Sequence, residues 1–119
     1  MNKKQTGIKR IFSAYKNSSR AFVWLLKNEA AFQQEALLAC LLLPVIAFVD
    51  VGILHKLLLL FSLVFVLLVE VVNTAIEAVV DRVGKEFNQL SGLAKDLGSL
   101  AVLLSFIFAA VVWLSLLYV

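Results

Sequence analysis

Residues 97–119 form a run of 23 residues without a charged side chain, and this run restricts the possible fold more than any other feature. About 20 apolar residues cross a bilayer as an α-helix, because a helix satisfies its own backbone polar groups. Two further charge-free apolar runs cover residues 36–49 and 57–69. We therefore predict a single membrane domain with three transmembrane helices, at residues 30–49, 54–82 and 93–118.

The region before these runs, residues 7–27, is amphipathic. Its apolar side chains recur at helical spacing, whereas four basic residues form a separate stripe: Lys9, Lys16, Arg20 and Lys27. Such a helix lies in the membrane interface, and the apolar runs that follow favour this over packing on a soluble partner. The predicted fold class is all-α, an integral membrane helical bundle with three transmembrane helices and an N-terminal amphipathic surface helix.

The basic residues also predict the orientation of the chain in the membrane. Seven of the eleven Lys and Arg residues lie within residues 1–27 and three within residues 82–95, whereas the predicted turn between the first two spans has only Lys56. Cytoplasmic segments are enriched in Lys and Arg, so we predict a cytoplasmic N-terminus and a periplasmic C-terminus in a bacterial inner membrane. Trp113 and Tyr118 fit an aromatic belt near the end of the last span. We expect no nucleic-acid partner.

One face of the second predicted span is acidic and polar. Asn73, Glu77 and Asp81 follow Glu70 at separations of 3, 7 and 11 residues, which places all four on one helical stripe. A helix that enters the hydrocarbon near Leu57 reaches its other boundary near Glu77, so Glu70 is predicted to lie inside the membrane. A buried acid there indicates a functional site that faces the bundle interior. The alternative is a structural network in which Lys95 or Arg82 satisfies these acids.

Further charged residues are predicted at the same boundary as Glu77. Glu29 precedes the first span, and Lys95 and Asp96 open the third. Because Mg²⁺ takes one or two carboxylates together with phosphate oxygens and water, Glu29 and Glu77 predict a site for Mg²⁺. Lys95 is suited to a phosphate, although an ion pair with Asp96 or Glu77 explains it equally well.

The spacing of the five glycines excludes a P-loop and a Gly-rich kinase loop. Phosphoryl transfer nevertheless needs only an aligned acceptor, charge neutralisation and a base, which the predicted acids and Lys95 can supply. Two other interpretations stay open. Glu70 could be the proton carrier of a small proton-coupled transporter. The polar stripe could also join helices in a structural or assembly protein, helped by small residues such as Ala94 and Gly98.

Three segments resemble the signatures of the prokaryotic diacylglycerol kinase family. They are N-E-A-A-F-Q-Q-E at residues 28–35, V-E-V-V-N-T-A-I-E-A-V-V-D-R at residues 69–82 and A-K-D-L-G-S at residues 94–99. The resemblance extends over about residues 7–118. It implies phosphorylation of diacylglycerol by ATP with Mg²⁺, in a homotrimer whose active sites form between subunits.

The resemblance also implies roles for individual residues. Glu70 would be the catalytic base, and Glu29 and Glu77 would hold the metal, with Asn73 and Asp81 in support. The implied nucleotide contacts are Arg10, Asn17, Glu29, Glu77, Glu86, Phe87, Asn88, Lys95 and Asp96. The implied lipid contacts are Arg10, Ala14, Ala31, Phe32, Gln34, Glu35, Glu70, Ser99 and Trp113.

The chain departs from residues that are frequent in the family at five positions, Asn17, Gln33, Phe87, Asn88 and Leu93. Related undecaprenol kinases usually lack the A-A-F-x-Q-E pattern that this chain has at residues 30–35. The resemblance therefore favours diacylglycerol as the acceptor, with undecaprenol as the alternative.

Overall fold

The computed structural model describes residues 6–118, and every regular element in that part of the chain is an α-helix. The helices are α1 (Ile8–Asn28), α2 (Ala30–Phe48), α3 (Ile53–Val83) and α4 (Gln89–Leu117). Helices α2, α3 and α4 are each long and apolar enough to cross a membrane. The predicted all-α class with three such helices is therefore confirmed. Lys3, Lys4 and Val119, which entered the sequence predictions, lie outside the described residues.

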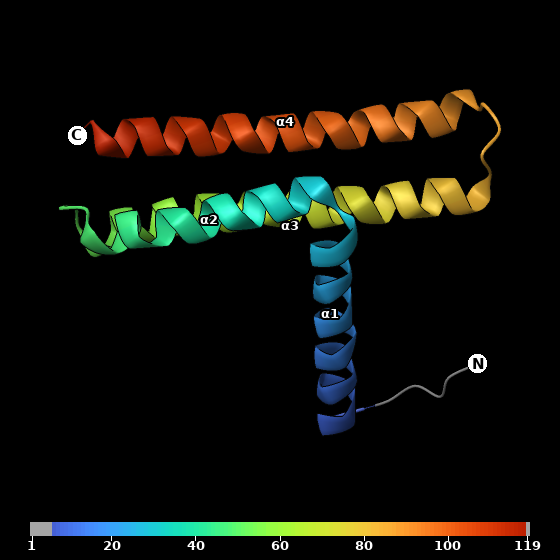
Figure 1. Ribbon diagram of the computed structural model, residues 1–119, viewed down its shortest axis with the longest axis horizontal. Helices are drawn as coiled ribbons and strands as arrows, with labels where there is room; N and C mark the ends of the chain where they lie inside the picture. The colour runs from blue at the N-terminus through green and yellow to red at the C-terminus, as the bar shows by residue number, and fades with distance from the viewer. Residues whose placement is uncertain (1–5, 119) are drawn as a thin grey trace.

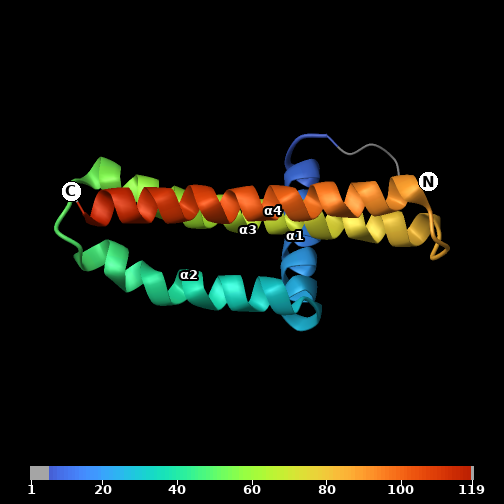
Figure 2. The ribbon, with the colours of Figure 1, turned by 90° about the horizontal axis from the view of Figure 1, so that it is seen from above.

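Helices α2, α3 and α4 lie side by side, and the chain reverses direction between successive helices, whereas α1 is oriented crosswise to them and projects out of the bundle from its junction with α2 (Figure 1, Figure 2). The corner between α1 and α2 is formed at Glu29, whose extended backbone has φ −114° and ψ 107°. The rings of Phe22 and Phe32 meet edge to face across this corner, with centroids 5.8 Å apart. Phe32 is only 2% exposed, so this aromatic pair holds α1 across the bundle.

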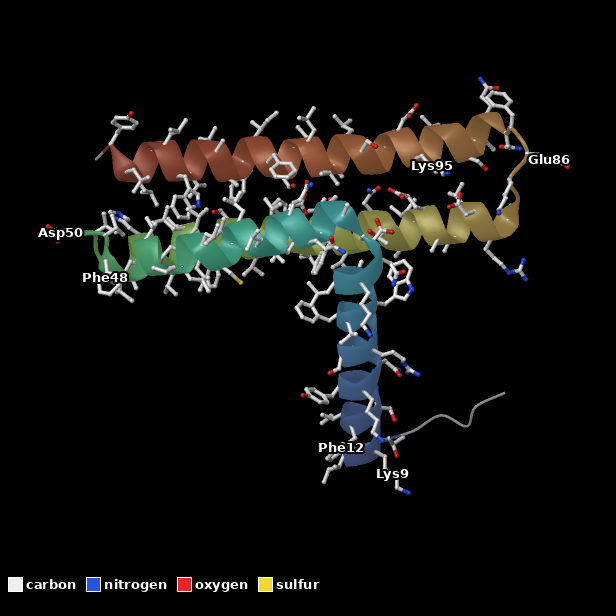
Figure 3. The ribbon with its side chains drawn as sticks, viewed as in Figure 1. Lys9, Phe12, Phe48, Asp50, Glu86 and Lys95 are labelled. Carbon is white, nitrogen blue, oxygen red and sulfur yellow. The ribbon has the colours of Figure 1, made fainter. Side chains whose placement is uncertain are left out.

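The orientation of α1 fits a surface helix. Figure 3 shows Phe12 on the side of α1 that faces the Phe48 and Asp50 end of the bundle, whereas Lys9 lies on the side toward Glu86. If α2, α3 and α4 cross the bilayer, α1 therefore directs its apolar face into the lipid and its basic face to the aqueous phase. The amphipathic pattern and the tertiary arrangement agree.

The contact between α3 and α4 uses one stripe of α3. Its buried side chains are Leu59, Ser62, Val66, Glu70 and Asn73, which recur at intervals of three and four residues. The residues buried on α4 are Gly98 and Ser105, both small. Small residues let membrane helices approach closely, so these two helices form the core of the protein.

Trp113 corrects one sequence prediction, because its indole points into the bundle. Its Nε1 donates a hydrogen bond of 3.0 Å to Ser62 Oγ, and Ser62 Oγ donates one of 2.7 Å to the Leu59 carbonyl oxygen. A lone polar N–H among apolar helices is stabilised by such a partner more than by the interface. The aromatic-belt interpretation of Trp113 is therefore wrong.

Replacement of Ser62 by Ala should lower the free energy of unfolding by about 1 kcal/mol, because the indole N–H of Trp113 loses its acceptor. Reversible unfolding in mixed micelles with increasing dodecyl sulfate measures this change. Ser115→Ala, at an exposed position of the same helix as Trp113, is the matched control and should leave stability near that of the wild type. Equal stability of Ser62→Ala and Ser115→Ala would contradict the prediction.

Helix α4 begins at Gln89 rather than at the predicted residue 93. Asn88 Oδ1 accepts hydrogen bonds from the backbone N–H groups of Leu90 (2.9 Å) and Ser91 (3.2 Å). This N-cap satisfies donors that the helix itself leaves unpaired, so an extra turn forms ahead of the apolar run.

Candidate active site along helix α3

The predicted polar stripe lies on the face of α3 that turns toward the bundle. Glu70 is 6% exposed and Asn73 is 7% exposed, while Glu77 is half-buried and Asp81 is exposed. Asn73 Nδ2 donates a hydrogen bond of 2.9 Å to Glu77 Oε1. The stripe thus runs from a buried acid to an exposed acid along one helix.

The polar stripe lies in the second half of α3, beside α1. Helix α3 begins at Ile53, one residue before the predicted start at residue 54, and Glu70 lies 17 residues further on, or about 26 Å along the helix. Trp24 and Leu25 of α1 share a cavity with residues that follow Glu70, including Thr74. The position of Glu70 inside the membrane stays a prediction, and Glu77 lies about 10 Å further along α3.

Several carboxylates approach one another around Glu70. Its side chain interacts electrostatically with those of Glu29 and Glu77 and closely with that of Glu35. These acids come from the first turns of α2, including its N-cap Glu29, and from two positions about two turns apart on α3. A concentration of negative charge at the membrane edge is costly unless a cation offsets it.

No side-chain cation of residues 6–118 forms a direct ion pair with Glu29, Glu70 or Glu77. In residues 6–118 the one ion pair joins Lys95 Nζ to Asp81 Oδ1 at 2.8 Å. This contact corrects the interpretation that Lys95 pairs with Asp96 or Glu77. Lys95 acts on Glu77 only at longer range, so no direct ion pair offsets the charge of Glu29, Glu70 and Glu77, and their oxygen donors would suit a divalent cation such as Mg²⁺.

No group of three or more Asp, Glu, His or Cys side chains within residues 6–118 is placed to hold a metal on its own. Mg²⁺ usually keeps several waters and takes only one or two carboxylates together with substrate phosphates. Mg²⁺ at Glu29 and Glu77 would therefore take its remaining ligands from water or from a bound phosphate group.

An apolar cavity of about 220 Å³ opens between α2, α3 and α4. Glu35 and Trp113, both implied as lipid contacts, line it together with apolar side chains such as Leu63 and Val66. Glu35 Oε2 is buried and has no hydrogen-bond partner. The cavity thus joins an acidic group beside Glu70 to an apolar space suited to an acyl chain.

A polar pocket of about 380 Å³ lies at the other end of the stripe, around the loop between α3 and α4. Asp81, Lys95 and the loop residues Glu86, Phe87 and Asn88 line it. Figure 3 shows Glu86 at the tip of this loop, with Lys95 further along α4. This pocket therefore brings together the implied nucleotide contacts Glu86, Phe87, Asn88 and Lys95. The side chain of Asn88, however, is already hydrogen-bonded as the N-cap of α4.

Other implied residues are not brought to Glu70. Arg10 and Ala14 lie toward the N-terminal end of α1, which leads away from the bundle (Figure 1). Arg10 is 19 residues before Glu29, or about 28 Å along a helix. Asn17 accepts a hydrogen bond from Arg20 and lines the cavity between α1 and α3.

The remaining implied lipid and nucleotide contacts differ in how exposed their side chains are. Phe32 packs on Phe22 at the corner of α1 and α2, which leaves little of its ring for a lipid. Exposed positions on α2 and α4 are occupied by Ala31, Gln34, Asp96 and Ser99.

Two residues of the site region have roles that the sequence analysis missed. Ser62 lies eight residues before Glu70 on the same face of α3, and this spacing was the signal that could have found it. Gly98 on α4 faces Asn73 on α3. The spacing of residues along one helix cannot predict such a contact between two helices.

The sequence matches the prokaryotic diacylglycerol kinase family over residues 16–117. It is 44% identical over 115 residues to a diacylglycerol kinase of Escherichia coli (strain K12), which covers 95% of this chain and 93% of that protein. The diacylglycerol kinase of Pseudomonas aeruginosa is 41% identical, with coverages of 97% and 94%. That of Haemophilus influenzae is 36% identical, with coverages of 97% and 98%.

Proposed function

Because the chain belongs to the prokaryotic diacylglycerol kinase family, we propose that it transfers the γ-phosphoryl group of ATP to diacylglycerol and forms phosphatidic acid. Family membership makes the chain a lipid kinase, and its three long apolar helices indicate an inner-membrane protein. The observation that carries the proposal is the position of Glu70, a nearly buried acid between an apolar cavity and a row of polar groups.

Glu70 is the proposed general base. A lipid hydroxyl at the membrane edge donates its proton to the Glu70 carboxylate while the hydroxyl oxygen bonds to the γ-phosphorus. The bond from that phosphorus to the bridging oxygen of the β-phosphate breaks, and ADP leaves. Glu35 and Trp113 line the space that would take part of the lipid, and Ala31, Gln34 and Ser99 offer further exposed contacts.

The phosphate donor is proposed to bind on the outer side of Glu70. Glu29 and Glu77 would hold Mg²⁺, which offsets negative charge on the phosphates when it is bound. Lys95 exchanges its ion pair with Asp81 for a phosphate oxygen, and Asp96 and the loop residues Glu86 and Phe87 flank the nucleotide. The lack of a direct ion pair to these acids within residues 6–118 supports this assignment.

The proposal includes the homotrimer that the family resemblance implies and the orientation that the basic residues predict. Arg10 and Ala14 lie too far along α1 to reach Glu70 of their own chain, so a neighbouring subunit would receive them. Asn17 would follow them into such a shared site. The N-terminus is placed in the cytoplasm and the C-terminus in the periplasm, because ATP and the basic face of α1 then share one side.

The test is transfer of radiolabelled phosphate from Mg·ATP to dioleoylglycerol, with the purified full-length chain in mixed micelles. Undecaprenol at the same mole fraction is assayed in parallel. We expect labelled phosphatidic acid to exceed labelled undecaprenyl phosphate at least tenfold, since the motif at residues 30–35 favours diacylglycerol. Preferential labelling of undecaprenol would overturn the substrate assignment, and labelling of neither lipid would overturn the proposed reaction.

A further inference from the structure

Gly98 and Asn73 fit together at the contact between α3 and α4. A Cβ atom built on Gly98 would overlap Asn73 Oδ1 and would lie only 3.1 Å from Asn73 Cγ. The overlap with Oδ1 is closer than Cβ atoms approach other heavy atoms in folded proteins. Any side chain at position 98 must therefore displace the side-chain amide of Asn73. Gly92 on the same helix has open space at the corresponding point. The requirement for glycine is therefore specific to position 98.

The two ends of the Asn73 side-chain amide have different surroundings. Its Nδ2 donates to Glu77 Oε1 at 2.9 Å, whereas its Oδ1 is buried and has no hydrogen-bond partner. Because only the Nδ2 group of this buried amide forms a hydrogen bond, the bond to the Glu77 carboxylate alone determines its orientation. The surface behind Oδ1 is the bare backbone of Gly98, so the position of the amide depends on the absence of a side chain there.

We propose that Gly98 is a positioning residue for Glu77 and that it acts through Asn73. The missing side chain admits the Asn73 amide between α3 and α4, and the amide then orients the carboxylate that faces the phosphate donor. This inference rests on the proposed role of Glu77 as a metal ligand. It assigns Gly98 a function in metal binding, beyond the helix packing that small residues usually serve.

Gly98→Ala should raise the Mg²⁺ concentration for half-maximal activity by about tenfold, as expected when a group that orients a metal ligand is lost. The chain should still fold, since the atoms that must move belong to one side chain that can rotate. Gly52→Ala adds the same methyl group in open space at the turn between α2 and α3, away from the pocket around Lys95, and should keep the metal requirement of the wild type. An unchanged metal requirement in Gly98→Ala would overturn the inference.

Asn73→Ala separates positioning from packing. This variant removes the hydrogen bond to Glu77 and also the atoms that overlap a Cβ at position 98. Its metal requirement should rise about as much as that of Gly98→Ala, and adding Gly98→Ala to it should change the requirement less than twofold. Additive effects of the two substitutions would show independent roles and would overturn the inference.

Glu77→Gln distinguishes failure of this inference from failure of the proposed function. If Glu77→Gln leaves the metal requirement unchanged, Glu77 is not a metal ligand, and the side-chain amide signals of Asn73 then test the fit alone. In nitrogen-15 spectra of the micellar protein these signals should shift in Gly98→Ala and stay in place in Gly52→Ala. Unshifted signals in Gly98→Ala would overturn the inference, whatever Glu77 does.

Discussion

Glu70→Gln is expected to lower the rate of phosphate transfer to dioleoylglycerol by about 100- to 10,000-fold, the range that a general base contributes. The amide matches the carboxylate in size but cannot accept the hydroxyl proton at neutral pH. Thr74 Oγ1 donates to the backbone carbonyl oxygen of Glu70 at 3.0 Å, and this contact does not depend on the side chain that is changed. Helix α3 should therefore stay intact while turnover is lost. Initial rates at saturating Mg·ATP and lipid measure the effect.

Asp50→Asn is the matched control for Glu70→Gln. It also replaces a carboxylate by an amide, but at the exposed turn between α2 and α3, at the opposite end of the bundle from Glu86 (Figure 3). Its turnover should remain within about twofold of the wild type, because surface substitutions away from a site have small effects. Near-normal turnover of a folded Glu70→Gln protein would show that Glu70 is not the base.

Glu77→Gln is expected to reduce activity at a fixed, subsaturating Mg²⁺ concentration by about 100-fold, since a charged ligand to the metal is lost. Gln can still accept the hydrogen bond from Asn73 Nδ2, so the substitution changes charge with little change in packing. Rates measured as a function of free Mg²⁺ should show a higher half-saturating concentration. A lower maximal rate with an unchanged half-saturating concentration would instead assign Glu77 to another step.

Asp50→Asn serves again as the control for the loss of one negative charge, because its metal requirement should match that of the wild type. Substitution of Mn²⁺ for Mg²⁺ adds a second readout. Mn²⁺ generally binds N and O ligands more tightly than Mg²⁺, so part of the activity of Glu77→Gln should return with it. No recovery with Mn²⁺, together with an unchanged Mg²⁺ requirement, would contradict metal binding by Glu77.

Features that depend on one segment of the chain could be predicted from the sequence. The three apolar runs required helices, because lipid offers no partner for an unpaired backbone group. The stripe from Glu70 to Asp81 followed from helical periodicity, and the structure places it on one face of α3. The amphipathic pattern of α1 likewise gave its place across the bundle, since the pattern is a property of that helix alone.

Features that depend on how helices meet were decided only by the tertiary structure. The rotation and register of α4 against α3 determine that Lys95 reaches Asp81, that Trp113 reaches Ser62 and that Gly98 receives Asn73. These contacts join residues far apart in the sequence, and their geometry depends on the packing of many side chains at once. The sequence by itself therefore determined which residues are polar and which helix face carries them, whereas packing between helices decided their partners.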